Sequence, residues 1–204
     1  TIFAVLRRHD PTSPPSVNEA LRPGRDLIAA GYALYGPSTL MVISTGQGVH
    51  VFTMDPNVGE FFLCQSNVRC PPRGTTYSIN EGNYARWTQG VQKWNAWIKG
   101  ESKDDGRPYG HRYVGSLVAD AHRTLLKGGI FAYPAYKKSP KGKLRLLYEA
   151  NPMAFICEQA GWAGIDGDAR ILDLSPGSLH ERTPLILGSK DDVEAFRAFA
   201  TGAR

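Results

Sequence analysis

The chain has 204 residues, of which 42% are hydrophobic, and its 24 Lys and Arg against 19 Asp and Glu give a formal net charge of +5. These values are ordinary for a globular protein, exclude a disordered or fibrous chain, and allow one large domain or two small ones. The charge excess gathers in Arg7-Arg8 and in the segment 137–145. Such a mild excess favours a small anionic ligand over a nucleic-acid duplex, which needs many phosphate contacts.

The first third of the chain predicts a strand-rich unit. Residues 1–6 (T-I-F-A-V-L) predict a strand with no turn or cap before it, so its partners are expected elsewhere. Three short strands follow, separated by Gly-, Asn- and Pro-containing turns, at 40–44, 49–54 and 60–64. Consecutive strands on tight turns predict an antiparallel meander, and the segment 71–74 (P-P-R-G) is the best candidate for a domain boundary.

The middle of the chain predicts two helices and two strands. Trp87, Trp94 and Trp97 mark one face of a first helix. Ser116 and Gly128-Gly129 bound a second helix over 117–127. Strands are predicted at 130–133, where Pro134 ends the run, and at 144–148, with a basic loop between them.

Glu149 closes the strand 144–148, and Asn151-Pro152 opens a helix over 153–160. The tail predicts strands at 171–174 and 184–187 and a last helix over 191–200, capped by Ser189. The predicted fold class is therefore α+β, with a mixed sheet in each half of the chain.

Several polar residues form a candidate anion site. Phenols, an amide, a guanidinium and an ammonium group could hold a phosphate and sugar hydroxyls. These residues are Asn80, Tyr84, Arg112, Tyr113, Tyr133 and Lys143. The pattern leaves open the alternative that the tyrosines are structural, with a packed ring and a solvent-exposed hydroxyl group.

Other chemistry-bearing residues have structural interpretations. Glu149 alone is a weak metal candidate because a divalent ion needs several oxygen ligands. His111 and His122 lack a nearby nucleophile, and Cys157 lies on an apolar helix face. The segment 55–59 (D-P-N-V-G) lacks the second acid of a phosphatase aspartate motif and predicts a turn.

The cysteine count and the apolar runs bear on location. The chain has three cysteines without metal-ligand spacing, which predicts reduced thiols in the cytoplasm. No apolar run approaches the roughly 18 residues of a membrane span, so no membrane partner is expected. Because the chain does not begin with Met, its natural start is expected upstream.

Read together, several blocks resemble class I fructose-1,6-bisphosphatase over almost the whole chain. The segments that carry the resemblance include G-Y-A-L-Y-G at 31–36, D-P-N-V-G-E-F at 55–61, Y-S-I-N-E-G-N-Y at 77–84, R-Y-V-G-S-L-V-A-D-A-H-R-T-L-L-K-G-G-I-F-A-Y-P-A at 112–135, and K-S-P-K-G-K-L-R-L-L-Y-E-A-N-P-M-A at 138–154. The resemblance implies a layered α/β/α/β/α fold with mixed, largely antiparallel sheets, of which this chain covers the later part. It also implies that residues 1–74 belong to an N-terminal, AMP-type domain and residues 75–204 to a C-terminal, fructose-bisphosphate-binding domain.

The resemblance further implies an activity, a cofactor and partners. The expected reaction is hydrolysis of the 1-phosphate of fructose 1,6-bisphosphate to fructose 6-phosphate, in gluconeogenesis, by metal-activated water. The expected metal is Mg²⁺, with Mn²⁺ or Zn²⁺ as alternatives. The expected assembly is a cytoplasmic homo-oligomer, specifically a tetramer, with no nucleic-acid partner.

By resemblance, each candidate residue receives a role. Asn80, Tyr84, Tyr113 and Tyr133 would hold the 6-phosphate, and Arg112 would reach the same phosphate in a neighbouring subunit. Lys143 would contact the sugar, and Glu149 would be a metal ligand. Two departures from the family pattern are Asn83, an extra residue before Tyr84, and Leu117, where some relatives carry methionine.

One family segment is missing from the sequence. The D-P-L-D-G-S-S segment and the paired glutamates that supply most metal ligands in the family do not occur in these 204 residues. The chain by itself is therefore expected to be nearly inactive. Two alternatives stay open, namely a bifunctional enzyme that also accepts sedoheptulose 1,7-bisphosphate, and a non-catalytic remnant that binds sugar phosphates.

Overall fold

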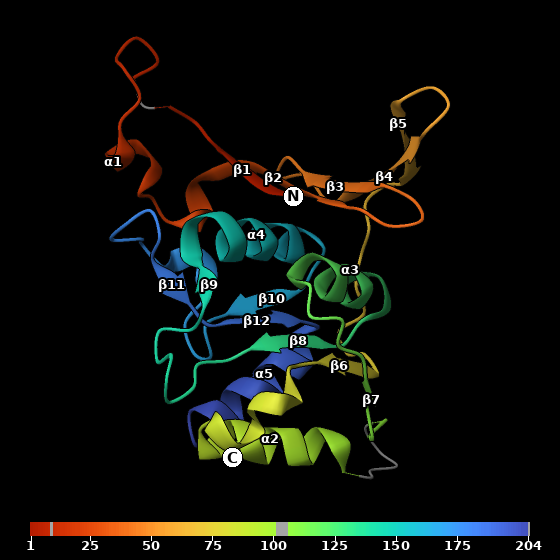
Figure 1. Ribbon diagram of the computed structural model, residues 1–204, viewed down its shortest axis with the longest axis vertical. Helices are drawn as coiled ribbons and strands as arrows, with labels where there is room; N and C mark the ends of the chain where they lie inside the picture. The colour runs from red at the N-terminus through yellow and green to blue at the C-terminus, as the bar shows by residue number, and fades with distance from the viewer. Residues whose placement is uncertain (9, 101–105, 204) are drawn as a thin grey trace.

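Sheets and helix pairs alternate along the long axis of the molecule (Figure 1). The computed structural model describes residues 1–8, 10–100 and 106–203. A first sheet lies at one end and a second sheet lies near the middle. The helices are α3 (Leu117–Lys127) and α4 (Asn151–Gln159) between the sheets, and α2 (Gln89–Lys99) and α5 (Lys190–Ala200) at the far end. This β/α/β/α stack confirms the predicted α+β class and corresponds to the later layers of the expected fold.

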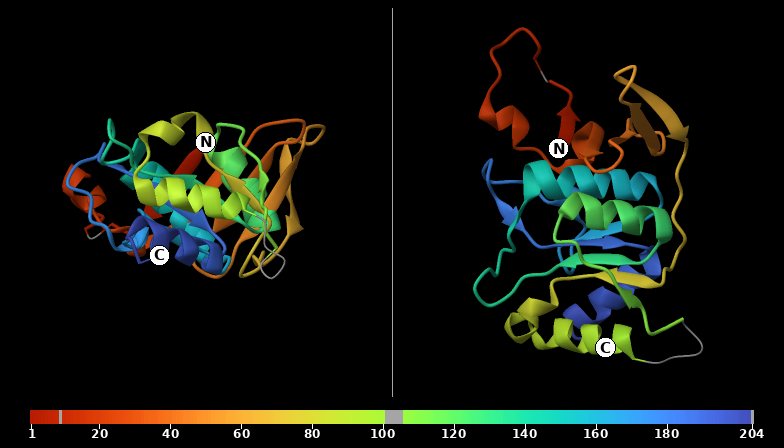
Figure 2. Two further views of the ribbon diagram at one scale, coloured as in Figure 1. Left: turned by 90° about the horizontal axis from the view of Figure 1, so that it is seen from below. Right: turned by 45° about the vertical axis from the view of Figure 1, so that its right-hand side comes forward.

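The first sheet is an antiparallel meander, as its short strands and tight turns predict, so the prediction of a mixed sheet in this half of the chain is wrong. Its strands, in spatial order, are β1 (Ile2–Leu6), β2 (Leu27–Leu34), β3 (Leu40–Ser44), β4 (His50–Asp55) and β5 (Glu60–Gln65). The first strand pairs with β2, a strand that was not predicted and that follows the short helix α1 (Val17–Ala20) and a 3-10 turn, η1 (Gly24–Asp26). β5 lies at the edge, and its hairpin projects from the body of the molecule (Figure 2).

The hairpin between β4 and β5 is closed by the predicted turn. The backbone N–H of Asn57 donates to the Asp55 carboxylate at 2.8 Å. Gly59 adopts a positive φ of 77°, which a side chain would disfavour. Asp55 thus closes the turn, as predicted.

The second sheet is mixed. Its spatial order is β10 (Ala163–Ile165), β12 (Leu185–Gly188), β8 (Ile130–Tyr133), β6 (Thr76–Ser78) and β7 (Gly110–His111). β6 runs parallel to both β7 and β8, whereas β12 is antiparallel to β8 and to β10. β6, β7 and β10 were not predicted, because strands of two or three residues are too short to show an alternating pattern.

Two strand predictions are wrong. Only Leu144–Arg145 forms a strand, β9, which pairs with β11 (Arg182–Thr183). The next five residues form a π-helical turn, η3 (Leu146–Ala150), which leads directly into α4. The segment predicted as a strand at 171–174 is a 3-10 turn, η4 (Ile171–Asp173). Both segments are short apolar runs, whose burial fits a strand or a helical turn equally well.

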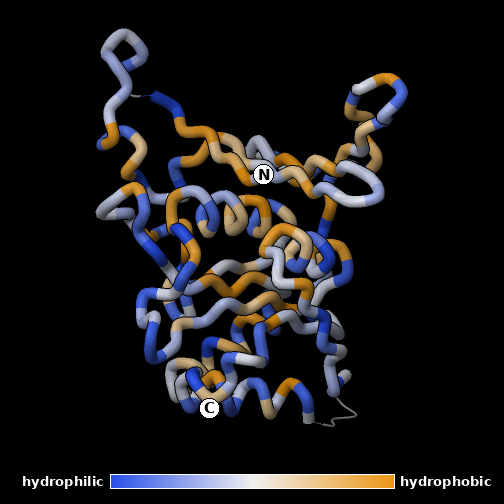
Figure 3. The backbone as a smooth tube through the Cα atoms, in the orientation of Figure 1, coloured by the Kyte–Doolittle hydropathy of each residue, from blue (hydrophilic) through white to orange (hydrophobic). Residues whose placement is uncertain are grey.

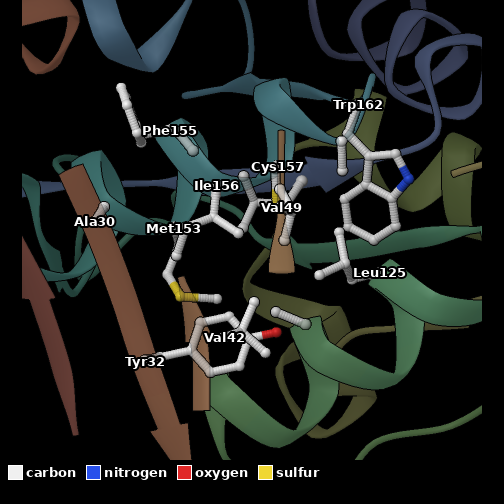
Figure 4. Close-up of a cluster of buried hydrophobic side chains, with 14 of the residues drawn as sticks. Ala30, Tyr32, Val42, Val49, Leu125, Met153, Phe155, Ile156, Cys157 and Trp162 are labelled. Atoms are coloured by element: carbon white, nitrogen blue, oxygen red, sulfur yellow. The ribbon is translucent and has the colours of Figure 1, made fainter. Parts of the chain in front are cut away.

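Hydrophobic side chains pack on both faces of the second sheet. One cluster lies between the sheets and places Tyr32 and Val42 opposite Met153 and Ile156 of α4 (Figure 4). The other lies between the second sheet and α2 and α5, and it includes the fully buried Trp94. Figure 3 shows the corresponding hydrophobic stretches along the strands of both sheets.

Residues of β8 alternate between these two clusters. Ile130 and Ala132 belong to the cluster beneath α2 and α5, whereas Phe131 belongs to the cluster around α4. The strand is therefore buried on both sides, which fixes its register and the position of its last residue, Tyr133.

Within the described ranges, no helix has both the length and the apolar character that crossing a lipid bilayer would require.

Candidate functional site

Three parallel strands, β6, β7 and β8, end on the same side of the second sheet. Predicted site residues lie at or just after the end of each strand. Asn80 comes two residues after β6, Arg112 and Tyr113 come directly after β7, and Tyr133 is the last residue of β8. The carboxyl ends of parallel strands are where sheet proteins commonly bind ligands. Strand direction thus brings together residues that are far apart in the sequence.

Tyr113 is a neighbour of both Asn80 and Tyr133. Burial raises the pKa of the Tyr113 phenol, and the nearby Tyr133 and Asp120 add to this increase. A hydrogen bond with the Asn80 side chain acts in the opposite direction. The phenol therefore stays protonated at neutral pH and can donate a hydrogen bond to an anion.

A small pocket opens beside these residues. Its lining consists of Ile79, Asn80, Asn83, Trp87, Ala132, Tyr133, Pro134 and Tyr136. Asn83, Trp87 and Tyr136 line this pocket but were not among the predicted site residues. The sequence had marked Asn83 only as an extra residue in the family pattern and Trp87 only as part of a helix face.

Tyr84 lies outside this pocket lining. Its side chain is 43% exposed, and its ring packs edge-on against Trp87 with 5.7 Å between ring centroids. The chain at this point forms a 3-10 segment, η2 (Glu81–Arg86), which is capped by the Asn80 side chain accepting from the Gly82 N–H at 3.1 Å. The structure thus places Tyr84 at the rim.

Lys143 contacts Tyr136, which lines the pocket. Its Nζ lies 5.6 Å from the centroid of the Tyr136 ring, a cation–π distance. Lys143 donates a hydrogen bond to the Tyr136 phenol oxygen, which raises the pKa of Lys143, and electrostatic interaction with Tyr136 and Tyr133 adds to the increase. The lysine stays cationic and belongs to the same group of side chains.

Arg112 is exposed beside the pocket and does not line it. Its backbone N–H donates to the Tyr77 carbonyl at 2.9 Å, and its Nη1 donates to the His111 carbonyl at 2.8 Å. His111 stacks on Tyr77 at 4.8 Å, and its Nε2 lies 2.9 Å from the Ile79 carbonyl oxygen. These contacts give His111 the structural role that was predicted for it.

Glu149 lies within η3 and not at the end of a strand, which corrects the predicted position. Its Oε2 accepts the Arg145 backbone N–H at 2.6 Å. In the part of the chain that the structure describes, no group of three or more His, Cys, Asp or Glu side chains forms a metal-binding cluster. Because a divalent ion needs several oxygen ligands, these residues do not complete a metal site.

Two further predictions of structural roles hold. The buried His122 places its Nδ1 2.8 Å from the Tyr32 hydroxyl. Cys157 is buried on α4, burial raises the pKa of its thiol, and it is a free cysteine like Cys64 and Cys70. A buried, protonated thiol is a poor nucleophile.

Comparison with known proteins covers the whole chain. The family model "Fructose-1-6-bisphosphatase, N-terminal domain" matches residues 1–66, and "Fructose-1-6-bisphosphatase, C-terminal domain" matches residues 70–201. Similar curated proteins named fructose-1,6-bisphosphatase class 1 occur in Sorangium cellulosum (65% identical), Chloroherpeton thalassium (51%) and Chlorobaculum tepidum (52%), each over all of this chain. The chain spans 59%, 59% and 62% of the length of these relatives, respectively.

Proposed function

Because this chain belongs to the fructose-1,6-bisphosphatase family, we propose that it forms the sugar-phosphate-binding part of a class 1 enzyme. That enzyme would hydrolyse the 1-phosphate of fructose 1,6-bisphosphate and release fructose 6-phosphate in the cytoplasm. The observation that carries the proposal is the convergence of Asn80, Tyr113 and Tyr133 at the ends of parallel strands.

In this proposal the converging side chains bind the 6-phosphate. Asn80, Tyr113 and Tyr133 donate hydrogen bonds to its oxygens, and Lys143 supplies a positive charge on the sugar side. Tyr84 joins them from the rim by turning its exposed ring. Arg112, which is exposed beside the pocket, reaches the phosphate bound by a neighbouring subunit of a homotetramer.

Glu149 is proposed as one ligand of a divalent metal ion, Mg²⁺, with Mn²⁺ or Zn²⁺ as substitutes. Such an ion neutralises phosphate charge and generates the attacking hydroxide. The described residues offer it one carboxylate and no cluster, so no catalytic step is assigned to this chain alone. The 204-residue chain is expected to bind fructose 6-phosphate with negligible turnover of the bisphosphate.

Calorimetric titration of the chain with fructose 6-phosphate tests the binding role. Fructose 6-phosphate should bind and fructose should not, because the phosphate supplies the charged acceptor. Tyr133→Phe removes one donor to that acceptor and should weaken binding about tenfold. Tyr35→Phe is a matched control, because Tyr35 directly follows β2, is 64% exposed, and its hydroxyl lies 2.8 Å from the Thr1 hydroxyl. Equal affinity for fructose and fructose 6-phosphate would contradict the proposal.

Glu149→Gln tests the metal role in a chain extended to the length of its relatives. Phosphate release from fructose 1,6-bisphosphate should fall by orders of magnitude, because the neutral amide is a weaker ligand for a hard cation. Fructose 6-phosphate binding should be unchanged. Glu194→Gln, whose side chain is 69% exposed on α5, is the control. Activity of Glu149→Gln close to that of the unaltered enzyme would remove Glu149 from the metal site.

A further inference from the structure

A single buried carboxylate holds the loop that joins β7 to α3. Asp120 lies in the first turn of α3, and its side chain is 0% exposed. Its oxygens accept the Val114 N–H at 2.9 and 3.1 Å and the Gly115 N–H at 2.9 Å. Ser116, the N-cap residue, makes no side-chain cap bond, so Asp120 is the side chain that ties this loop to the helix.

Arg123 links this carboxylate to the backbone of Arg112. Its Nη2 donates to the Asp120 carboxylate at 2.9 Å and to the Arg112 carbonyl at 2.7 Å. The Arg112 N–H in turn donates to the Tyr77 carbonyl of β6 at 2.9 Å. The peptide groups on both sides of Arg112 are therefore fixed, one by the sheet and the other by α3.

The energetics favour a geometric role for this pair over a stabilising one. Burying an ion pair costs solvation that its attraction only partly returns, so the ion pair by itself is weak evidence for a stabilising role. A carboxylate that accepts several backbone N–H groups instead fixes one loop conformation. The loop fixed here carries two of the proposed phosphate-binding residues, Arg112 and Tyr113.

We propose that Asp120 and Arg123 are positioning residues for the bound phosphate, acting through the loop 112–115. They hold the Tyr113 phenol beside Asn80 and fix the backbone from which the Arg112 side chain leaves the surface. This inference rests on the proposed function, because it assumes that Tyr113 binds a sugar phosphate.

The same helix pattern elsewhere in the chain supplies a matched control. Asp192 lies in the first turn of α5, is 3% exposed, and accepts the Gly74 N–H at 3.0 Å and the Tyr109 hydroxyl at 2.8 Å. It contacts none of the proposed phosphate-binding residues through these bonds. A purely structural role for Asp120 predicts that the Asp→Asn change has the same consequences at both positions.

The experiment compares Asp120→Asn, Arg123→Met and Asp192→Asn in the 204-residue chain, by thermal unfolding and by titration with fructose 6-phosphate. All three variants should melt at lower temperature. Asp120→Asn and Arg123→Met should weaken fructose 6-phosphate binding about tenfold or more, because small displacements of binding groups are costly. Asp192→Asn should keep its dissociation constant within about twofold of the unaltered chain.

Hydrogen exchange of the Val114 and Gly115 amides supplies a second readout, since both should exchange faster in Asp120→Asn. Faster exchange with unchanged affinity would overturn the inference while leaving the proposed function intact. Failure of the unaltered chain to prefer fructose 6-phosphate over fructose would overturn the proposed function, and the inference with it. If Asp120→Asn does not fold, Arg123→Met decides by the same affinity criterion.

Discussion

At the scale of single residues, the pair formed by Tyr32 and His122 makes stability depend on pH. His122 is 6% exposed, and burial lowers its pKa below the ordinary value of 6.5. As pH falls below about 6.5, the unfolded chain takes up a proton that the folded chain refuses. The stability contributed by neutral His122 is therefore complete above this pH and is lost as pH falls towards its folded pKa.

The expected result is a smaller loss of melting temperature between pH 7 and pH 5 in His122→Gln than in the unaltered chain. His180→Gln is the control, because His180 is exposed and its Nδ1 lies 3.0 Å from the hydroxyl of the exposed Tyr148. Thermal unfolding followed by circular dichroism at both pH values gives the comparison. An unchanged pH dependence in His122→Gln would contradict the role of burial.

Gly129 occupies a position that excludes any side chain. Its φ is +110°, and a Cβ built there would overlap the Thr76 carbonyl oxygen on β6. Gly129→Ala should therefore lower the free energy of unfolding by about 2–5 kcal/mol, as backbone strain and steric overlap add. Gly46→Ala, with a φ of +87° and no atom within 4 Å of the built Cβ, should cost only about 1–2 kcal/mol. The free energy of unfolding of both variants is measured by urea denaturation. Equal losses in Gly129→Ala and Gly46→Ala would show that the backbone shifts enough to relieve the overlap with Thr76.

At the scale of elements, β12 is the most completely buried strand of the second sheet. Each of its four residues is buried, and Leu187 is 0% exposed. Leu187→Ala should lower the free energy of unfolding by about 2–5 kcal/mol because it leaves a cavity between β12 and α4. Leu63→Ala on the edge strand β5, where Leu63 is 54% exposed, should change stability by less than about 0.5 kcal/mol. Similar losses at the two positions would contradict the assigned burial.

Elements with local start and stop signals were predictable from the sequence. The helix α3 has the predicted bounds because Gly128, with a φ of +80°, ends it. Elements defined by distant pairing were not predictable. β9 pairs with the distant β11 only through Leu144 and Arg145, and η3 follows where a longer strand was predicted. Tertiary contacts override local preference in such short segments.

The sequence identified candidate residues for the site, but it did not predict how they are arranged in space. Resemblance to the family supplied Asn80, Tyr113 and Tyr133, but the parallel pairing of β6 with its two neighbours is what brings them together. Strands of two and three residues carry no pattern that reveals such pairing. The rim position of Tyr84 and the contact between Lys143 and Tyr136 likewise depend on packing that no spacing encodes.

At the scale of the whole molecule, one hydrophobic cluster joins both halves of the chain. Tyr32 and Val42 of the first sheet pack with Met153 and Ile156 of α4, across the proposed boundary between 1–74 and 75–204. Separation of the halves would expose both sides of this cluster to water. The two proposed domains should therefore unfold together.

A single cooperative transition is the expected outcome. All four tryptophans (87, 94, 97 and 162) lie in the second half, so tryptophan fluorescence follows that half together with the cluster between the sheets, to which Trp162 belongs. Far-ultraviolet circular dichroism also reports on the first sheet. The two signals should give the same midpoint in urea. A first sheet that melts before the tryptophan signal changes would show that the halves are independent.

The parallel pairing of β6 with β7 and β8 has a kinetic consequence. Parallel strands cannot be joined by hairpins, so this sheet edge forms only after long segments of chain have closed on themselves. Such non-local contacts form slowly and late in folding. The edge proposed to bind the anion therefore forms only in molecules that have completed folding. A sugar phosphate that binds there would act as a stabilising ligand for the entire chain, and its concentration would set the fraction of folded molecules by mass action.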